Sequence, residues 1–117
     1  MVIHPYKGAS FNSETYKALG EPKYVNILYH RAKKIVIVRS CEDDATGAYQ
    51  ITGDRGRFNV TQRSLSDILY QLTNWSREIS YKCVGKYDTE AAGVVFNLNI
   101  AEMIEKRPYT RRNAVTA

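Results

Sequence analysis

The order of predicted elements recurs along this chain, and the recurrence constrains the fold more than any single motif does. Gly8-Ala9-Ser10-Phe11-Asn12-Ser13 opens a short helical pattern, and Gly56-Arg57-Phe58-Asn59-Val60-Thr61 opens a second one. Two strand-like runs, rich in β-branched and aromatic residues, follow each helix. We therefore predict an α+β fold with a mostly antiparallel sheet. It is built from two pseudo-symmetric strand–helix–strand–strand units, at about residues 8–40 and 49–100.

The first unit is expected to start with a helix of less than two turns. Asn12 or Ser13 is a suitable N-cap, because either side chain can accept a hydrogen bond from the free amides of the first turn. Gly20 suits the left-handed position after a helix, and Pro22 prevents its continuation. These signals place the helix at residues 14–19.

Extended segments are predicted on both sides of that helix. Residues 24–29 and 34–39 form a hairpin with a polar turn between them. Val2, Ile3 and Tyr6 form a short edge strand that is broken at Pro5, and Tyr49-Gln50-Ile51 resumes as a strand after an acidic connector.

The second helix carries the clearest amphipathic pattern in the chain. Thr61 or Ser64 is the expected N-cap, and Ser64 with Asp67 has the spacing of a capping box. Apolar side chains recur at helical spacing and are predicted to belong to the core: Leu65, Ile68, Leu69 and Leu72.

After this helix we predict strands at residues 77–84 and 93–98, joined by a loop at 86–92. Residues 99–106 are expected to form a last helical turn. The tail, residues 106–117, is polar and basic and is predicted to be disordered.

Length and composition indicate a single α+β domain over residues 1–105. The longest apolar run, residues 35–38, is too short to cross a membrane, and no secretory signal pattern is visible. Cys41 and Cys83 are too few for a disulfide framework. We therefore expect a cytoplasmic protein that does not bind membranes.

The formal net charge of +5 is distributed unevenly. Residues 1–39 carry +5, residues 40–105 carry −4 and the tail carries +4. This pattern disfavours a DNA-binding face spread over both units, but it allows the first unit and the tail to hold phosphate.

Two basic features are the candidate nucleic-acid contacts. One is the predicted hairpin turn, and the other is the tail, where cations alternate with an aromatic residue that can stack on a base. Each also has an ordinary structural explanation, namely charge that protects a sheet edge and a solvated chain end. The candidate residues are Arg31, Lys33, Lys34, Arg57, Lys106, Arg107, Arg111 and Arg112.

The sequence contains no recognisable motif for catalysis, metal binding or cofactor binding. His4 and His30 have no acidic or cysteine companion at a suggestive spacing, so solvated histidines are favoured over catalytic ones. Cysteine and histidine residues are scattered without paired metal-ligand spacing. Glycine-rich phosphate loops are absent from the sequence. We therefore predict a protein that is not an enzyme and needs no cofactor.

A set of short motifs is spread over about residues 8–100. They are Ser10-Phe11-Asn12, Tyr16-Lys17-Ala18-Leu19-Gly20, Pro22-Lys23-Tyr24-Val25, Leu28-Tyr29, Ile35-Val36-Ile37, Tyr49, Gly56, Phe58-Asn59-Val60 and Val94-Val95-Phe96-Asn97-Leu98. In these motifs the chain resembles a family of small proteins from bacteria and their phages, and the resemblance implies no particular activity.

In topology, a strand, a helix ending in Leu-Gly and a strand pair are also similar to the AbrB/MraZ class of swapped-hairpin transcription regulators. In that class two such units form a dimeric or pseudo-dimeric barrel that grips DNA with basic side chains. The resemblance implies that Arg31, Lys33, Lys34 and Arg57 would contact DNA here.

The leading prediction is a non-enzymatic bacterial or phage protein that binds nucleic acid through phosphate contacts and reads few bases. This prediction is compatible with a homodimer. The alternative is a protein-interaction module, such as a phage factor that inhibits a host protein, with exposed members of the nine tyrosines as anchors. A small-molecule binder and an enzyme are less favoured alternatives.

Overall fold

The computed structural model describes residues 1–53 and 58–104. This part of the chain has ten strands, two α-helices and one 3₁₀ helix. The strands are β1 (Val2–His4), β2 (Gly8–Phe11), β3 (Tyr24–His30), β4 (Ile35–Cys41), β5 (Tyr49–Gln50), β6 (Phe58–Val60), β7 (Ser80–Lys82), β8 (Gly85–Asp88), β9 (Gly93–Asn97) and β10 (Glu102–Ile104). The helices are α1 (Ser13–Ala18), α2 (Arg63–Thr73) and the 3₁₀ helix η1 (Leu98–Ile100).

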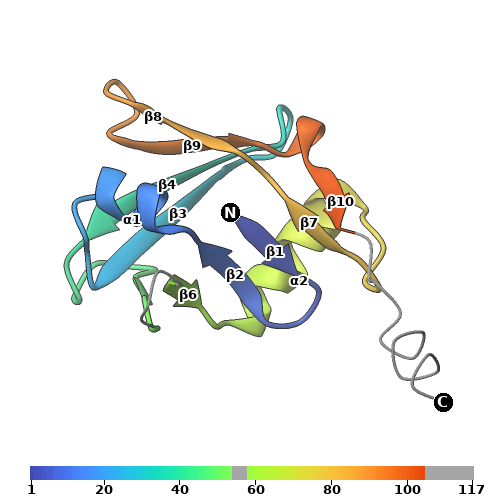
Figure 1. Cartoon of the computed structure of the whole chain (residues 1–117), viewed down its shortest axis with the longest axis horizontal. Coiled ribbons are helices and arrows are strands. Elements are labelled where there is room, and N and C mark those ends of the chain that lie inside the picture. The colour runs from blue at the N-terminus through green and yellow to red at the C-terminus, as the bar shows by residue number, and fades with distance from the viewer. Residues whose placement is uncertain (54–57, 105–117) are drawn as a thin grey trace, which may run out of the picture.

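The strands form two antiparallel sheets of five strands each. Sheet A has the order β10-β7-β1-β2-β6, and sheet B has the order β5-β3-β4-β9-β8. Figure 1 shows most of sheet B above and β1, β2 and β6 of sheet A below, beside α2. The fold is therefore mixed α+β and mostly β, but the prediction of one sheet is wrong. The short strands pair as two layers around one apolar core.

A bent hairpin joins the two sheets. Its first arm, residues 80–88, contains β7 and then β8, and its second arm, residues 93–104, contains β9 and then β10. Lys82 pairs with Glu102 in sheet A, whereas Gly85 pairs with Phe96 in sheet B. Between these pairs the second arm has more residues than the first, and η1 takes up the excess. The hairpin therefore changes sheets at η1 (Figure 1).

Residues 51 and 52 form a second connection between the two sheets. The backbone N–H of Ile51 donates a hydrogen bond to the carbonyl of Lys23, with an N–O distance of 2.8 Å. Thr52 forms a bridge with Asn59 in β6, with backbone N–O distances of 2.7 and 2.8 Å. The chain thus passes from sheet B to sheet A while remaining hydrogen-bonded to both.

The core lies between the sheets and against α2. Phe11 of sheet A and Phe96 of sheet B meet there, with ring centroids 6.4 Å apart. The other fully or nearly fully buried apolar side chains include Ile3, Ala9, Val25, Val36, Val38, Val60, Leu65, Leu69, Tyr70 and Val94. Leu65 and Leu69 confirm the apolar stripe predicted for the second helix, whereas Ile68 and Leu72 are only half-buried.

Three predicted elements differ from the observed ones. The segment at residues 2–4 is an interior strand, because β1 pairs with both β2 and β7. Residues 86–88, expected in a loop, belong to β8, which pairs with β9. Residues 102–104, expected in a helical turn, form β10 against β7. In each case long-range pairing decides the conformation, and local composition does not reveal it.

The two predicted units share their order of elements but not their pairing. In the first unit, β3 and β4 pair with each other over seven residues in sheet B. In the second unit, β7 lies in sheet A while β8 and β9 lie in sheet B. The strand pairing that follows the helices therefore gives the predicted duplication no support.

The two helices begin differently. Asn12 is the N-cap of α1, and its side-chain oxygen accepts a hydrogen bond of 2.9 Å from the Thr15 amide, as predicted. In α2 the N-cap is Gln62, which makes no side-chain capping bond. The predicted Thr61 or Ser64 cap is therefore wrong, because the helix begins between these two residues.

Ser66, on α2, fastens the helix to sheet A. This fully buried hydroxyl donates to the carbonyl of His4 at 2.6 Å and accepts from the amide of Gly8 at 2.7 Å. Gly8 has a φ of +79°, and a side chain there would collide with the backbone of Val60. The serine therefore satisfies both polar groups of a tight turn between β1 and β2.

We predict that Ser66→Ala lowers the free energy of unfolding by about 1–3 kcal/mol, because two buried backbone groups lose their partner. Urea unfolding measures this change. Ser64→Ala on the exposed side of the same helix is the matched control and should cost less than about 0.5 kcal/mol. Equal losses for the two variants would show that the buried hydroxyl is unimportant.

Candidate nucleic-acid interface

Three of the predicted phosphate contacts lie together at the turn between β3 and β4, residues 31–34. The hairpin pairs without interruption from Tyr24 opposite Cys41 to His30 opposite Ile35. Its length therefore projects Arg31, Lys33 and Lys34 at one end of sheet B. We call these three residues the basic turn. Arg31 and Lys33 are exposed, and Lys34 is half-buried.

The backbone of the basic turn is held in place by η1. The amide of Leu98 donates to the carbonyl of Lys34 at 2.9 Å, and the Asn99 side chain donates to the carbonyl of Lys33 at 2.8 Å. Within the turn, the Lys33 amide donates to Nδ1 of His30 at 3.2 Å. Lys34 has a φ of +55°, in the left-handed region. The three cations thus extend from a fixed backbone.

Charges in sheet B are separated by position along the strands. The acidic run at residues 42–44 follows β4 at the end of the hairpin opposite the basic turn. Asp88 and Glu90 lie at that same end, because β9 runs antiparallel to β4 with Gly93 near Arg39. Figure 1 shows the turn beside η1 and the acidic segments at the far end.

The separation protects the basic turn from neutralisation. A strand of seven residues spans roughly 20 Å, which exceeds the Debye length of about 8 Å at physiological ionic strength. None of the three cations forms an ion pair with a residue that the structure describes. Their positive potential is therefore available to an external anion.

Arg57, Lys106, Arg107, Arg111 and Arg112 lie outside the described residues. The structure therefore brings together three members of the predicted set.

A polar chain on the outer face of sheet A was not expected from the sequence. Nε2 of His4 lies 2.8 Å from the Ser10 hydroxyl, which donates to Oδ1 of Asn59 at 2.8 Å. The His4 side chain is half-buried, whereas the His30 side chain is exposed. This chain of polar side chains links the three strands β1, β2 and β6.

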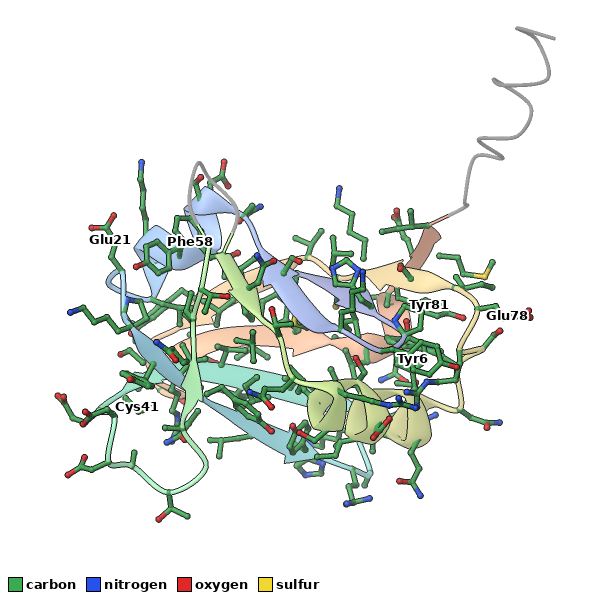
Figure 2. All side chains as sticks on the ribbon, turned by 90° about the horizontal axis from the view of Figure 1, so that it is seen from below. Tyr6, Glu21, Cys41, Phe58, Glu78 and Tyr81 are labelled. Carbon is green, nitrogen blue, oxygen red and sulfur yellow. The ribbon has the colours of Figure 1, made fainter. Side chains whose placement is uncertain are left out.

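A second unexpected cluster combines arginine with aromatic rings. The Arg77 guanidinium lies 4.5 Å from the ring centroid of Tyr6 and 5.2 Å from that of Tyr70. Tyr70 in turn meets Trp75 and Tyr81, whose rings stack at 4.0 Å. Figure 2 shows Tyr6 and Tyr81 together at one end of the molecule. The high number of tyrosines is visible in the sequence, but the contacts among their rings cannot be read from it.

The charge of this cluster is partly neutralised. Arg77 forms an ion pair of 2.7 Å with Asp67, and Arg63 lies 4.0 Å from the same carboxylate. The Asp67 side chain therefore belongs to this ion pair and not to the predicted capping box. This makes the cluster a weaker phosphate site than the basic turn.

Both cysteines are free thiols. Cys83 is buried and donates to the carbonyl of Asn97 at 3.2 Å, and burial raises the pKa of its thiol. Within residues 1–53 and 58–104, no group of three or more histidine, cysteine or acidic side chains could hold a metal ion. Every helix described is too short or too polar to cross a bilayer.

In comparisons with known proteins, the chain matches no family profile, no curated protein and no solved structure.

The aromatic cluster predicts an alkaline loss of stability. Burial raises the pKa of Tyr70 to about 12, above the value near 10 in the unfolded chain. Burial also raises the pKa of Tyr29. The folded state keeps these protons while the unfolded state releases them, so stability falls as pH rises from about 10 towards 12.

We expect Tyr70→Phe to flatten this dependence by up to about 1.4 kcal/mol per pH unit, because the phenol no longer titrates. Urea unfolding at several alkaline pH values measures the slope. At neutral pH the variant should lose about 1 kcal/mol, since the hydroxyl donates to the carbonyl of Ile79. If the free energy of unfolding depends on pH in the variant as it does in the native chain, Tyr70 is not the group responsible.

Proposed function

We propose that this protein binds nucleic acid without catalysing a reaction, and that the basic turn provides its phosphate contacts. The observation that carries the proposal is the separation of charge along sheet B. Within the described residues, Arg31, Lys33 and Lys34 form no ion pair at one end, and the carboxylates of that sheet gather at the other. A polyanion would approach the turn end and be repelled from the opposite end.

The proposed mechanism is counterion release. Each cation that neutralises a phosphate frees a condensed counterion, so affinity falls steeply with salt concentration. Long cationic side chains on a four-residue turn reach the backbone of a nucleic acid and give little base readout. The fixed backbone of the turn, held by Asn99 and Leu98, lowers the entropy lost on binding.

We further propose that Arg57 and the tail cations Lys106, Arg107, Arg111 and Arg112 add phosphate contacts. This part of the proposal rests on the sequence, in which Tyr109 lies among the tail cations. Such a segment can follow a single strand and stack on its bases.

The similarity to swapped-hairpin regulators belongs to the same proposal. One pairing supports it: β2 and β6, the first strands of the two units, lie antiparallel with Phe11 opposite Phe58. A twofold axis through this pair would relate the two Phe-Asn dipeptides. A bacterial or phage origin and a cytoplasmic location likewise remain proposals based on resemblance and composition.

The triple variant Arg31→Gln, Lys33→Gln and Lys34→Gln tests the function. Fluorescence anisotropy with labelled single-stranded and double-stranded DNA, over a series of salt concentrations, gives the affinity and its salt slope. We expect weaker binding and a log–log slope for duplex DNA that is shallower by about 0.9 per lost phosphate contact.

The matched control is the variant Lys7→Gln, Lys17→Gln and Lys23→Gln, which removes the same charge from exposed positions away from the turn. It should retain most of the affinity. Equal weakening by both variants would indicate a dependence on net charge alone. An affinity of the native chain that does not change with salt would overturn nucleic-acid binding.

A second candidate function is protein interaction, and one observation favours it. Five large apolar side chains of the bent hairpin and η1 are exposed: Val84, Tyr87, Ile100, Met103 and Ile104. Of the eight tyrosines that the structure describes, Tyr6 and Tyr87 are exposed, and Tyr87 lies on a strand, β8. Capture of a host protein that survives nuclease and high salt would favour this candidate over the first.

A further inference from the structure

We propose that two copies of this chain associate edge to edge through β8, with a twofold axis at Tyr87. Among the residues that the structure describes, β8 is the last strand of sheet B and pairs only with β9. Its other side therefore presents the backbone groups of an unpaired edge. Antiparallel pairing of two such edges would join the five-stranded sheets B of both copies into one sheet.

The exposed side chains at β8 are unusual for a protected edge. Val84, directly before the strand, is 77% exposed and Tyr87 is 47% exposed. Sheet edges are commonly protected by charges that repel a second copy. A β-branched residue and an aromatic residue at an edge instead offer apolar contact area.

The charge pattern of β8 complements itself. Lys86 and Asp88 flank Tyr87 and lie on the same face of the strand, since alternate residues point the same way. With Tyr87 opposite its counterpart, each Lys86 lies opposite the other copy's Asp88. Cross-strand Cβ distances of about 5 Å then form two ion pairs.

This complementarity distinguishes β8 from the comparable edge of sheet A. In β10, self-pairing about Met103 would place Glu102 opposite Ile104, with no cation to meet the carboxylate. If Lys86 were the only charged residue of β8, the lysines of the two copies would repel each other. Asp88, two residues later, gives each lysine a carboxylate to pair with. Within the described residues, neither Lys86 nor Asp88 forms an ion pair inside one chain.

Charge reversal tests the proposal directly. Lys86→Glu places two carboxylates opposite each other, and Asp88→Lys places two ammonium groups opposite each other. Analytical ultracentrifugation at low salt measures the dissociation constant of the dimer. For each single variant this constant should be higher than that of the native dimer by roughly tenfold or more. An equimolar mixture of the two variants should regain the two-chain mass, because the mixed dimer has only attractive pairs.

The double variant Lys86→Glu with Asp88→Lys should also dimerise, since it reverses both partners of every pair. Lys7→Glu and Asp44→Lys are controls at exposed sites outside β8 and should leave the mass unchanged. A native chain that stays monomeric at high concentration would overturn the proposal. A dimer that persists in both single variants would overturn it as well, because a different surface would then hold the copies together.

Discussion

The structure depends on the corner in the hairpin of residues 80–104. At this corner the chain leaves one sheet and enters the other, and η1 takes up the residues that have no partner. Gly85 makes the corner possible, because any larger side chain would collide with the rings and methyl groups of Phe96 and Val94. Phe96 can therefore fill the core against Phe11. The same η1 holds the carbonyls of Lys33 and Lys34, so the corner that closes the core also fixes the basic turn.

Electrostatics in this molecule follow strand ends and not the two halves of the sequence. The sequence divides into a basic first segment and an acidic second one. In space, however, Lys23 and Arg39 of the first segment lie at the acidic end of sheet B, where Arg39 donates to the carbonyl of Ala91. Antiparallel pairing thus brings opposite charges together at one end and leaves Arg31 and its neighbours at the other. Net charge alone could not have identified the favourable end.

Local chemistry allowed part of the fold to be predicted. The Asn12 cap, the hairpin between residues 24 and 41 and the buried positions of α2 depend on neighbours within a few residues. Pairing partners could not be predicted, because alternation and β-propensity do not specify which strand lies beside which. The interior place of β1 is one example. For the site, Arg31, Lys33 and Lys34 were found together because they are adjacent in sequence, whereas the η1 clamp requires Asn99, far along the chain.

The interior position of β1 has a consequence for biosynthesis. One side of this strand is completed by β2 a few residues later, but the other side needs β7, which begins at Ser80. At translation rates of about 5–20 residues per second, the ribosome requires on the order of ten seconds to produce that partner. During this interval Ile3 and the free backbone groups of β1 are accessible to water, to other nascent chains and to chaperones. During vectorial synthesis, β1 therefore stays without its second neighbour until β7 has emerged.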